Sequence, residues 1–160
     1  MFKKKFLQDP VVGRQEKPRQ EGLTMVLDLG IGLKELVDLL QYGADYIDFY
    51  KLTFGTSLLY PEDILREKIL LLRQEDIEIY PGGTLFEIAL TQDKINRYFK
   101  WLKKLNFSAI EISDGTITLT DEKRKLLVES AKRMGFTVLT EVGKKEKTKT
   151  LQAKEMVEKV

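Results

Sequence analysis

The chain contains neither cysteine nor histidine. Without cysteine it can form no disulfide, no thiolate nucleophile and no cysteine-ligated metal site, and the cytoplasm is its simplest location. Without histidine it can form no Ser-His triad and no histidine base, so acid–base chemistry would fall to Lys, Asp, Glu or Tyr. Any bound metal would be a hard cation with oxygen ligands.

Long apolar runs and an excess of one charge are also missing. No apolar run approaches the roughly 20 residues that a membrane-spanning helix needs. The basic start MFKKKFLQDP has no apolar core behind it, so we expect neither a membrane protein nor a secreted one. The net charge of +2 comes from interleaved signs and does not favour a nucleic-acid partner. With 160 residues, 42% of them hydrophobic, the chain has the composition of one globular domain.

Five short apolar runs, each followed by an amphipathic stretch, organise residues 22–160 after an irregular lead-in over residues 1–21. The runs start between 24 and 32 residues apart, which is the length of a β-strand plus a crossover helix, so they predict consecutive βα units. The predicted strands are Leu23–Asp28, Ile47–Leu52, Ile77–Tyr80, Ala109–Ser113 and Thr137–Val142. Helices are predicted over about Leu33–Gln41, from Pro61 onward, over Asp93–Leu105, over about Thr120–Met134 with Thr120 as N-cap, and from about Leu151.

This pattern leaves two architectures open. The length favours an open doubly wound sheet, whereas the even unit size and plain order favour five-eighths of a (β/α)8 barrel. In both folds the ligand site lies beyond the carboxyl ends of the strands. The residues that close each run are therefore the candidates for chemistry.

Glycine-rich patches follow two of the predicted strands. Gly82-Gly83-Thr84 offers backbone N–H groups and a hydroxyl to a phosphate or carboxylate, and Ser113-Asp114-Gly115-Thr116 offers a similar patch. Each is equally consistent with an ordinary tight turn.

Lys51 lies near the end of the second predicted strand, in phase with apolar neighbours. A lysine inside a parallel sheet is unusual unless it meets an anion or a carboxylate. The functional interpretation is anion binding, and the structural one is a salt bridge to Asp48 or Asp28.

Further charged residues accompany the fourth and fifth strands. Glu111 and Glu141 interrupt apolar strands, and several acids converging at strand ends would suit a hard cation. Lys144 and Lys145 begin a charge run, usually a solvated surface, but they lie just past a strand end. Together, the strand-end residues describe a site for an anionic substrate.

Five blocks of sequence follow the predicted strands in order: 22–28 (GLTMVLD), 45–51 (DYIDFYK) with 55–57 (GTS), 80–87 (YPGGTLFE), 110–116 (IEISDGT) and 140–145 (TEVGKK). Together these blocks resemble the phosphosulfolactate synthase family. The resemblance covers about residues 17–147.

The resemblance implies a (β/α)8 barrel of which this chain holds about five βα units and lacks the three C-terminal ones. It also implies a Mg²⁺-dependent lyase that forms a homo-oligomer, with a trimer as the expected form. The enzyme would add sulfite to phosphoenolpyruvate to give (2R)-3-phosphosulfolactate, toward coenzyme M in methanogens or sulfolactate in some bacteria. Sulfite attacks the methylene carbon, charge moves into the carboxylate and the neighbouring carbon is protonated, which requires cations and a positioned acid.

The resemblance gives each candidate residue a role. Lys145 would be the general acid, Lys51 would bind phosphate or sulfite, and Glu141 would be a third catalytic residue. The metal ligands, direct or through water, would be Asp28 and Glu111, with Glu141 as a further candidate. The substrate-binding residues would be Gly82, Gly83, Thr84, Ser113, Asp114 and Lys144.

Two local departures from the family pattern lie at the lip of the expected pocket. Leu29 stands where the family usually has a polar residue, and Thr53-Phe54 replaces a usual Gly-Trp. With the missing units, they favour a second hypothesis, a non-catalytic or truncated relative with an assembly or stress-related role. A third, from the pattern alone, is another barrel enzyme that acts on a phosphorylated acid.

Overall fold

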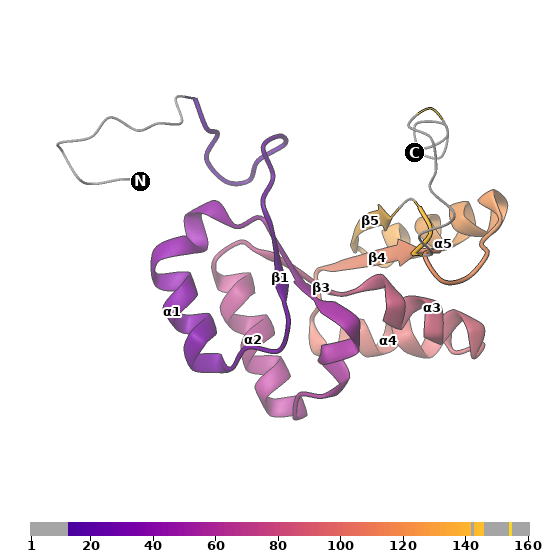
Figure 1. Ribbon diagram of the computed structural model, residues 1–160, viewed down its shortest axis with the longest axis horizontal. Helices are drawn as coiled ribbons and strands as arrows, with labels where there is room; N and C mark the ends of the chain where they lie inside the picture. Colours follow the sequence, from indigo (N-terminus) through magenta and orange to yellow (C-terminus); the bar gives the residue numbers. More distant parts are fainter. Residues whose placement is uncertain (1–12, 142, 146–153, 155–160) are drawn as a thin grey trace.

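Five parallel strands alternate with helices in the computed structural model, which describes residues 13–141, 143–145 and 154 (Figure 1). The strands are β1 (Met25–Asp28), β2 (Phe49–Leu52), β3 (Glu78–Pro81), β4 (Ala109–Ser113) and β5 (Thr137–Glu141). β1, β2 and β3 form one parallel sheet in that order, and β4 pairs in parallel with β5. All five predicted strands are therefore present.

β3 and β4 lie side by side, and the N–H of Ile79 donates to Ser108 Oγ at 3.0 Å between them. The strands thus follow one another in chain order across both sheets. A doubly wound sheet reverses its order at a switch point, whereas a barrel adds each new strand at the same edge. The plain order identifies the fold as part of a (β/α)8 barrel and excludes the open alternative.

The predicted helices are α1 (Leu33–Gly43), α2 (Glu62–Gln74), α4 (Ile95–Leu105) and α5 (Asp121–Arg133). As expected, Thr120 caps α5, because its side chain accepts from the N–H of Lys123. α1 and α2 lie together beside β1–β3, and α3, α4 and α5 surround β4 and β5 (Figure 1). No helix in the described part of the chain is both long and apolar enough to cross a membrane.

Three helical segments were not predicted from the sequence. They are α3 (Gly83–Thr91) and the 3₁₀ segments η1 (Ala44–Tyr46) and η2 (Thr53–Leu58). α3 is a correction, because the Gly82-Gly83-Thr84 patch is the start of a helix that buries Leu85 and Phe86. The end of the fifth predicted strand at Val142 and the predicted helix from Leu151 lie outside the described residues.

The side chains of successive strand residues point to opposite faces of the sheets. One face packs under the helices and is fully buried; it includes Tyr50, Leu52, Ile79, Ile110 and Ile112. The opposite face carries Lys51, which is in register with Leu27 and Tyr80. Because the period of a strand is two, this second face collects the polar residues Lys51, Glu111, Ser113 and Glu141.

The described part of the lead-in packs against the amino ends of the strands. Arg19 Nη1 lies 2.7 Å from Asp48 Oδ1, and both side chains are almost fully buried. The other carboxylate oxygen of Asp48 accepts from the N–H of Thr24 at 2.8 Å. Asp48 is thus a structural residue far from the carboxyl ends of the strands, and it is not the partner of Lys51.

Gly83 lets the first turn of α3 approach β4 closely. A Cβ on Gly83 would lie 2.2 Å from Ser113 Oγ and 2.7 Å from Ser113 Cβ. We predict that Gly83→Ala lowers the free energy of unfolding by about 1–3 kcal/mol through overpacking, measured by urea denaturation. The matched control is Gly43→Ala in α1, whose Cβ would lie an ordinary 3.4 Å from Leu39 Cδ1. Equal losses in the two variants would contradict this account.

Candidate functional site

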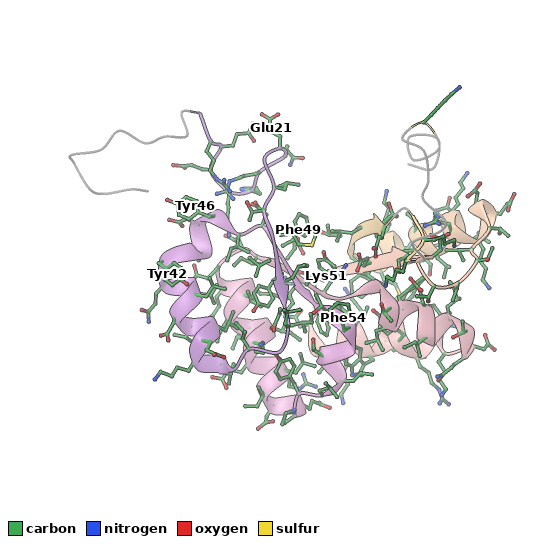
Figure 2. The ribbon with its side chains drawn as sticks, in the orientation of Figure 1. Glu21, Tyr42, Tyr46, Phe49, Lys51 and Phe54 are labelled. Carbon is green, nitrogen blue, oxygen red and sulfur yellow. The ribbon has the colours of Figure 1, made fainter. Side chains whose placement is uncertain are left out.

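Lys51 and Glu111 form an ion pair between β2 and β4, across the end of β3. Lys51 Nζ lies 2.7 Å from Glu111 Oε1, and the Glu111 side chain is 6% exposed. The second oxygen of Glu111 accepts from the N–H of Gly83 at 2.6 Å. Lys51 of β2 lies where the β1–β3 sheet meets the part of the chain that carries β4 and β5 (Figure 2). One carboxylate therefore links two strands and the N-terminus of α3, where the helix dipole favours negative charge.

Burial raises the pKa of Glu111 above its usual range, although the hydrogen bond and charge of Lys51 and the N–H of Gly83 favour the ionised form. Glu141 adds a second negative charge nearby, with its Oε2 4.0 Å from Lys51 Nζ. Lys51 thus faces two carboxylates, as we expected for a lysine inside a parallel sheet. Its partner is Glu111 rather than Asp48 or Asp28.

The two glycines at the start of α3, Gly82 and Gly83, do not present free N–H groups to an anion. The N–H of Gly82 donates to the carbonyl of Leu52 at 2.8 Å, and that of Gly83 is held by Glu111. An anion would have to displace Glu111 to reach Gly83. Both N–H groups are thus engaged within the protein, and the expected anion cradle stays a prediction.

The structure separates the two lysines after β5. Lys145 Nζ donates to the hydroxyl of Thr84 at 2.7 Å, so its ammonium group lies at the first turn of α3. Lys144 Nζ instead donates to the carbonyls of Asp114 and Ile117, at 2.6 and 2.5 Å. Lys145 is therefore the member of the pair that reaches the site, and Lys144 supports the loop after β4.

Asp114 is enclosed by cations. Its Oδ2 lies 3.0 Å from Arg124 Nη2 and 3.1 Å from Lys144 Nζ. Although burial opposes its ionisation, hydrogen bonds from these two residues hold the pKa of Asp114 below its usual range. Asp114 and Lys144 thus pair with each other in this geometry, and their expected substrate-binding roles stay predictions.

Glu87 of α3 is a buried site residue that the sequence interpretation missed. It accepts the N–H groups of Gly115 and Thr116 at 3.0 and 2.8 Å, and also the hydroxyls of Ser113 and Thr116. Burial opposes its charge, but these donors hold the pKa of Glu87 below its usual range. Ser113 is therefore committed to Glu87. Glu87 lies one helical turn after Gly83, and its place at the site could have been recognised only if α3 had been predicted.

Asp28 lies on the other face of its strand, because its neighbour Leu27 shares a register with Lys51. Its Oδ2 is 2.7 Å from Lys68 Nζ, and both side chains are fully buried. Burial opposes the charge, yet Lys68 and the N–H groups of Gly30 and Ile31 hold the pKa of Asp28 below its usual range. Asp28 is therefore not brought together with Glu111. Lys68 was missed, although a lysine on the apolar face of a helix was a usable signal.

The predicted metal ligands can be tested against the needs of a hard cation. Within residues 13–141, 143–145 and 154, no three acidic side chains form a cluster that could hold a metal ion. Asp28 and Glu111 each already pair with a lysine at 2.7 Å. Glu141, with a 39% exposed side chain, is the carboxylate that fits best. Mg²⁺ often uses one or two carboxylates and completes its shell with water and substrate oxygens.

Comparison with known proteins decides the family. The family model for (2R)-phospho-3-sulfolactate synthase (ComA) matches residues 12–160. The chain belongs to this family. It is 46% identical over 141 residues to the phosphosulfolactate synthase of Methanothermobacter thermautotrophicus, covering 88% of this chain and 54% of that protein.

Two other phosphosulfolactate synthases are also similar to this chain. The phosphosulfolactate synthase of Methanocaldococcus jannaschii is 47% identical over 126 residues, covering 79% of this chain and 50% of that protein. That of Bacillus subtilis is 38% identical over 133 residues, covering 83% of this chain and 52% of that protein. The chain thus spans about half the length of the curated synthases it matches.

The buried Lys68–Asp28 pair gives a prediction for stability. Lys68→Met leaves an unpaired buried carboxylate, so we expect the free energy of unfolding to fall by about 3–5 kcal/mol in urea denaturation. The double variant Lys68→Met/Asp28→Asn removes that charge and should regain a large part of the loss. A double variant less stable than Lys68→Met alone would contradict this interpretation.

The acids with lowered pKa values give a prediction for pH. Asp28, Glu87 and Asp114 ionise more readily in the folded chain than in the unfolded chain, so the unfolded state takes up their protons first as the pH falls. The contribution of these three acids to the free energy of unfolding should be complete above about pH 5 and decline below about pH 4, whereas Glu111, with its raised pKa, acts in the opposite direction. Glu87→Gln should be less stable at pH 7 and decline less steeply, as measured by denaturation across this range. An unchanged slope would remove Glu87 from the effect.

Proposed function

We propose that this chain carries part of a site at which sulfite adds to phosphoenolpyruvate to give (2R)-3-phosphosulfolactate. The observation that carries the proposal is that two lysines from different strand ends reach the first turn of α3. The ammonium group of Lys51 is linked to this turn by Glu111, which also accepts the N–H of Gly83. The ammonium group of Lys145 donates to the hydroxyl of Thr84 in the same turn. Both substrates are anions, and clustered ammonium groups with a helix N-terminus favour their binding together.

The lysines would have different roles in this reaction. An oxygen of phosphate or sulfite would replace Glu111 as the partner of Lys51. The sulfur lone pair attacks the methylene carbon, and the double-bond electrons move into the carboxylate. Lys145 would then give a proton to the adjacent carbon and complete the addition.

We further propose that Mg²⁺ binds at Glu141, with water and substrate oxygens as its remaining ligands. When bound, it would stabilise the negative charge that develops on the substrate carboxylate. Glu111 would contribute through water. The cytoplasmic location, expected from the absence of cysteine, and the trimer, implied by the family resemblance, stay predictions.

Lys145→Ala tests the proposed acid. With phosphoenolpyruvate, sulfite and Mg²⁺, we expect kcat for sulfite consumption to fall by about 10²–10⁴-fold, the usual contribution of a general acid. The matched control is Lys100→Ala, an exposed lysine of α4, which should retain the rate. An unchanged rate for Lys145→Ala would remove Lys145 from the mechanism. Binding of phosphoenolpyruvate without turnover by the unaltered chain would favour the non-catalytic relative.

A further inference from the structure

Gly115, in the loop between β4 and α5, lies directly against the side chain of Lys145. A Cβ built on Gly115 would lie 2.9 Å from Lys145 Cε, 3.1 Å from Cγ and 3.3 Å from Cδ. The backbone N–H of Lys145 donates to the carbonyl of Gly115 at 3.0 Å. The alkyl chain of Lys145 therefore runs over the bare Cα of Gly115 on its way to Thr84.

The backbone conformation does not require glycine at this position. The described glycines with positive φ are Gly13, Gly22, Gly30, Gly55, Gly135 and Gly143, and Gly115 is outside this set. Its φ therefore lies outside the left-handed region that favours glycine. What glycine supplies at position 115 is space for the lysine.

The loop that carries Gly115 is fixed from two sides. Glu87 accepts the N–H of Gly115 at 3.0 Å and that of Thr116 at 2.8 Å, and Arg124 holds the preceding Asp114 at 3.0 Å. The loop is therefore anchored by buried hydrogen bonds, while Lys145 is an exposed, flexible side chain. If a side chain were added at position 115, Lys145 would move and the loop would not.

We propose that Gly115 is a positioning residue for Lys145, whose ammonium group it directs to Thr84 and the first turn of α3. Any side chain at position 115 would push the lysine off this path and break its hydrogen bond to Thr84. The inference rests on the proposed function only where it concerns the rate, since the path of Lys145 can be measured without turnover.

The path is tested by trace acetylation of the full chain with acetic anhydride, followed by mass spectrometry. In Gly115→Ala, we expect the reactivity of Lys145 relative to Lys100 to rise about 2- to 10-fold, the range that a lost hydrogen bond predicts. Thr84→Val removes the acceptor directly and should raise it similarly. Gly43→Ala is the matched control and should leave it unchanged. Unchanged Lys145 reactivity in either Gly115→Ala or Thr84→Val would overturn the proposal.

The kinetic measurement separates this inference from the proposed reaction. With folding verified by circular dichroism, Gly115→Ala should lower kcat at least about tenfold with little change in KM, because a misplaced acid affects the chemical step. A labelling increase with an unchanged rate keeps Gly115 as a positioning residue and removes Lys145 as the acid. A lower rate without a labelling increase overturns the positioning role.

Discussion

The carboxylate of Glu111 sets the geometry of the strand ends, because it is buried and has two donors from separate elements. Lys51 arrives from β2 and the N–H of Gly83 from the start of α3, each within 2.7 Å. A buried carboxylate without such partners is costly, so the sheet and the helix are held in one relative position. Glu111 also places negative charge where the helix dipole favours it. In the proposed reaction, an anionic substrate competes for that same position.

The other charged groups near the strand ends are divided between structure and chemistry. Most of them have partners within the protein. Asp28 forms an ion pair with Lys68, Asp114 forms ion pairs with Arg124 and Lys144, and Glu87 accepts hydrogen bonds from the loop after β4. Among the described residues, Lys145 and Glu141 keep the most exposed charged groups at the site. The internal pairs fix the loops in place, and the remaining groups are free to respond to a ligand. This division is what a preorganised electrostatic site requires.

The sequence predicted the strands and most helices well, because their hydrophobic periods of two and 3.6 are local properties. α3 was missed because the sequence Gly82-Gly83-Thr84 is typical of a turn. In the structure, Gly83 instead allows the helix to approach Ser113 closely. Lys51, Glu141 and Lys145 lie at the strand ends, but the sequence did not specify their partners. Lys51 pairs with Glu111, 60 positions along the chain. Such pairing depends on the folded strand order, which periodicity does not specify.

The most direct test of the account is a crystal structure of this chain soaked with phosphoenolpyruvate. We expect an anionic group of the ligand to lie within hydrogen-bond distance of both Lys51 Nζ and Lys145 Nζ, and Lys51 to turn from Glu111 toward it. A ligand bound at the amino ends of the strands, or one that leaves the Lys51–Glu111 pair and Lys145 without contact, would show that these lysines do not form the binding site.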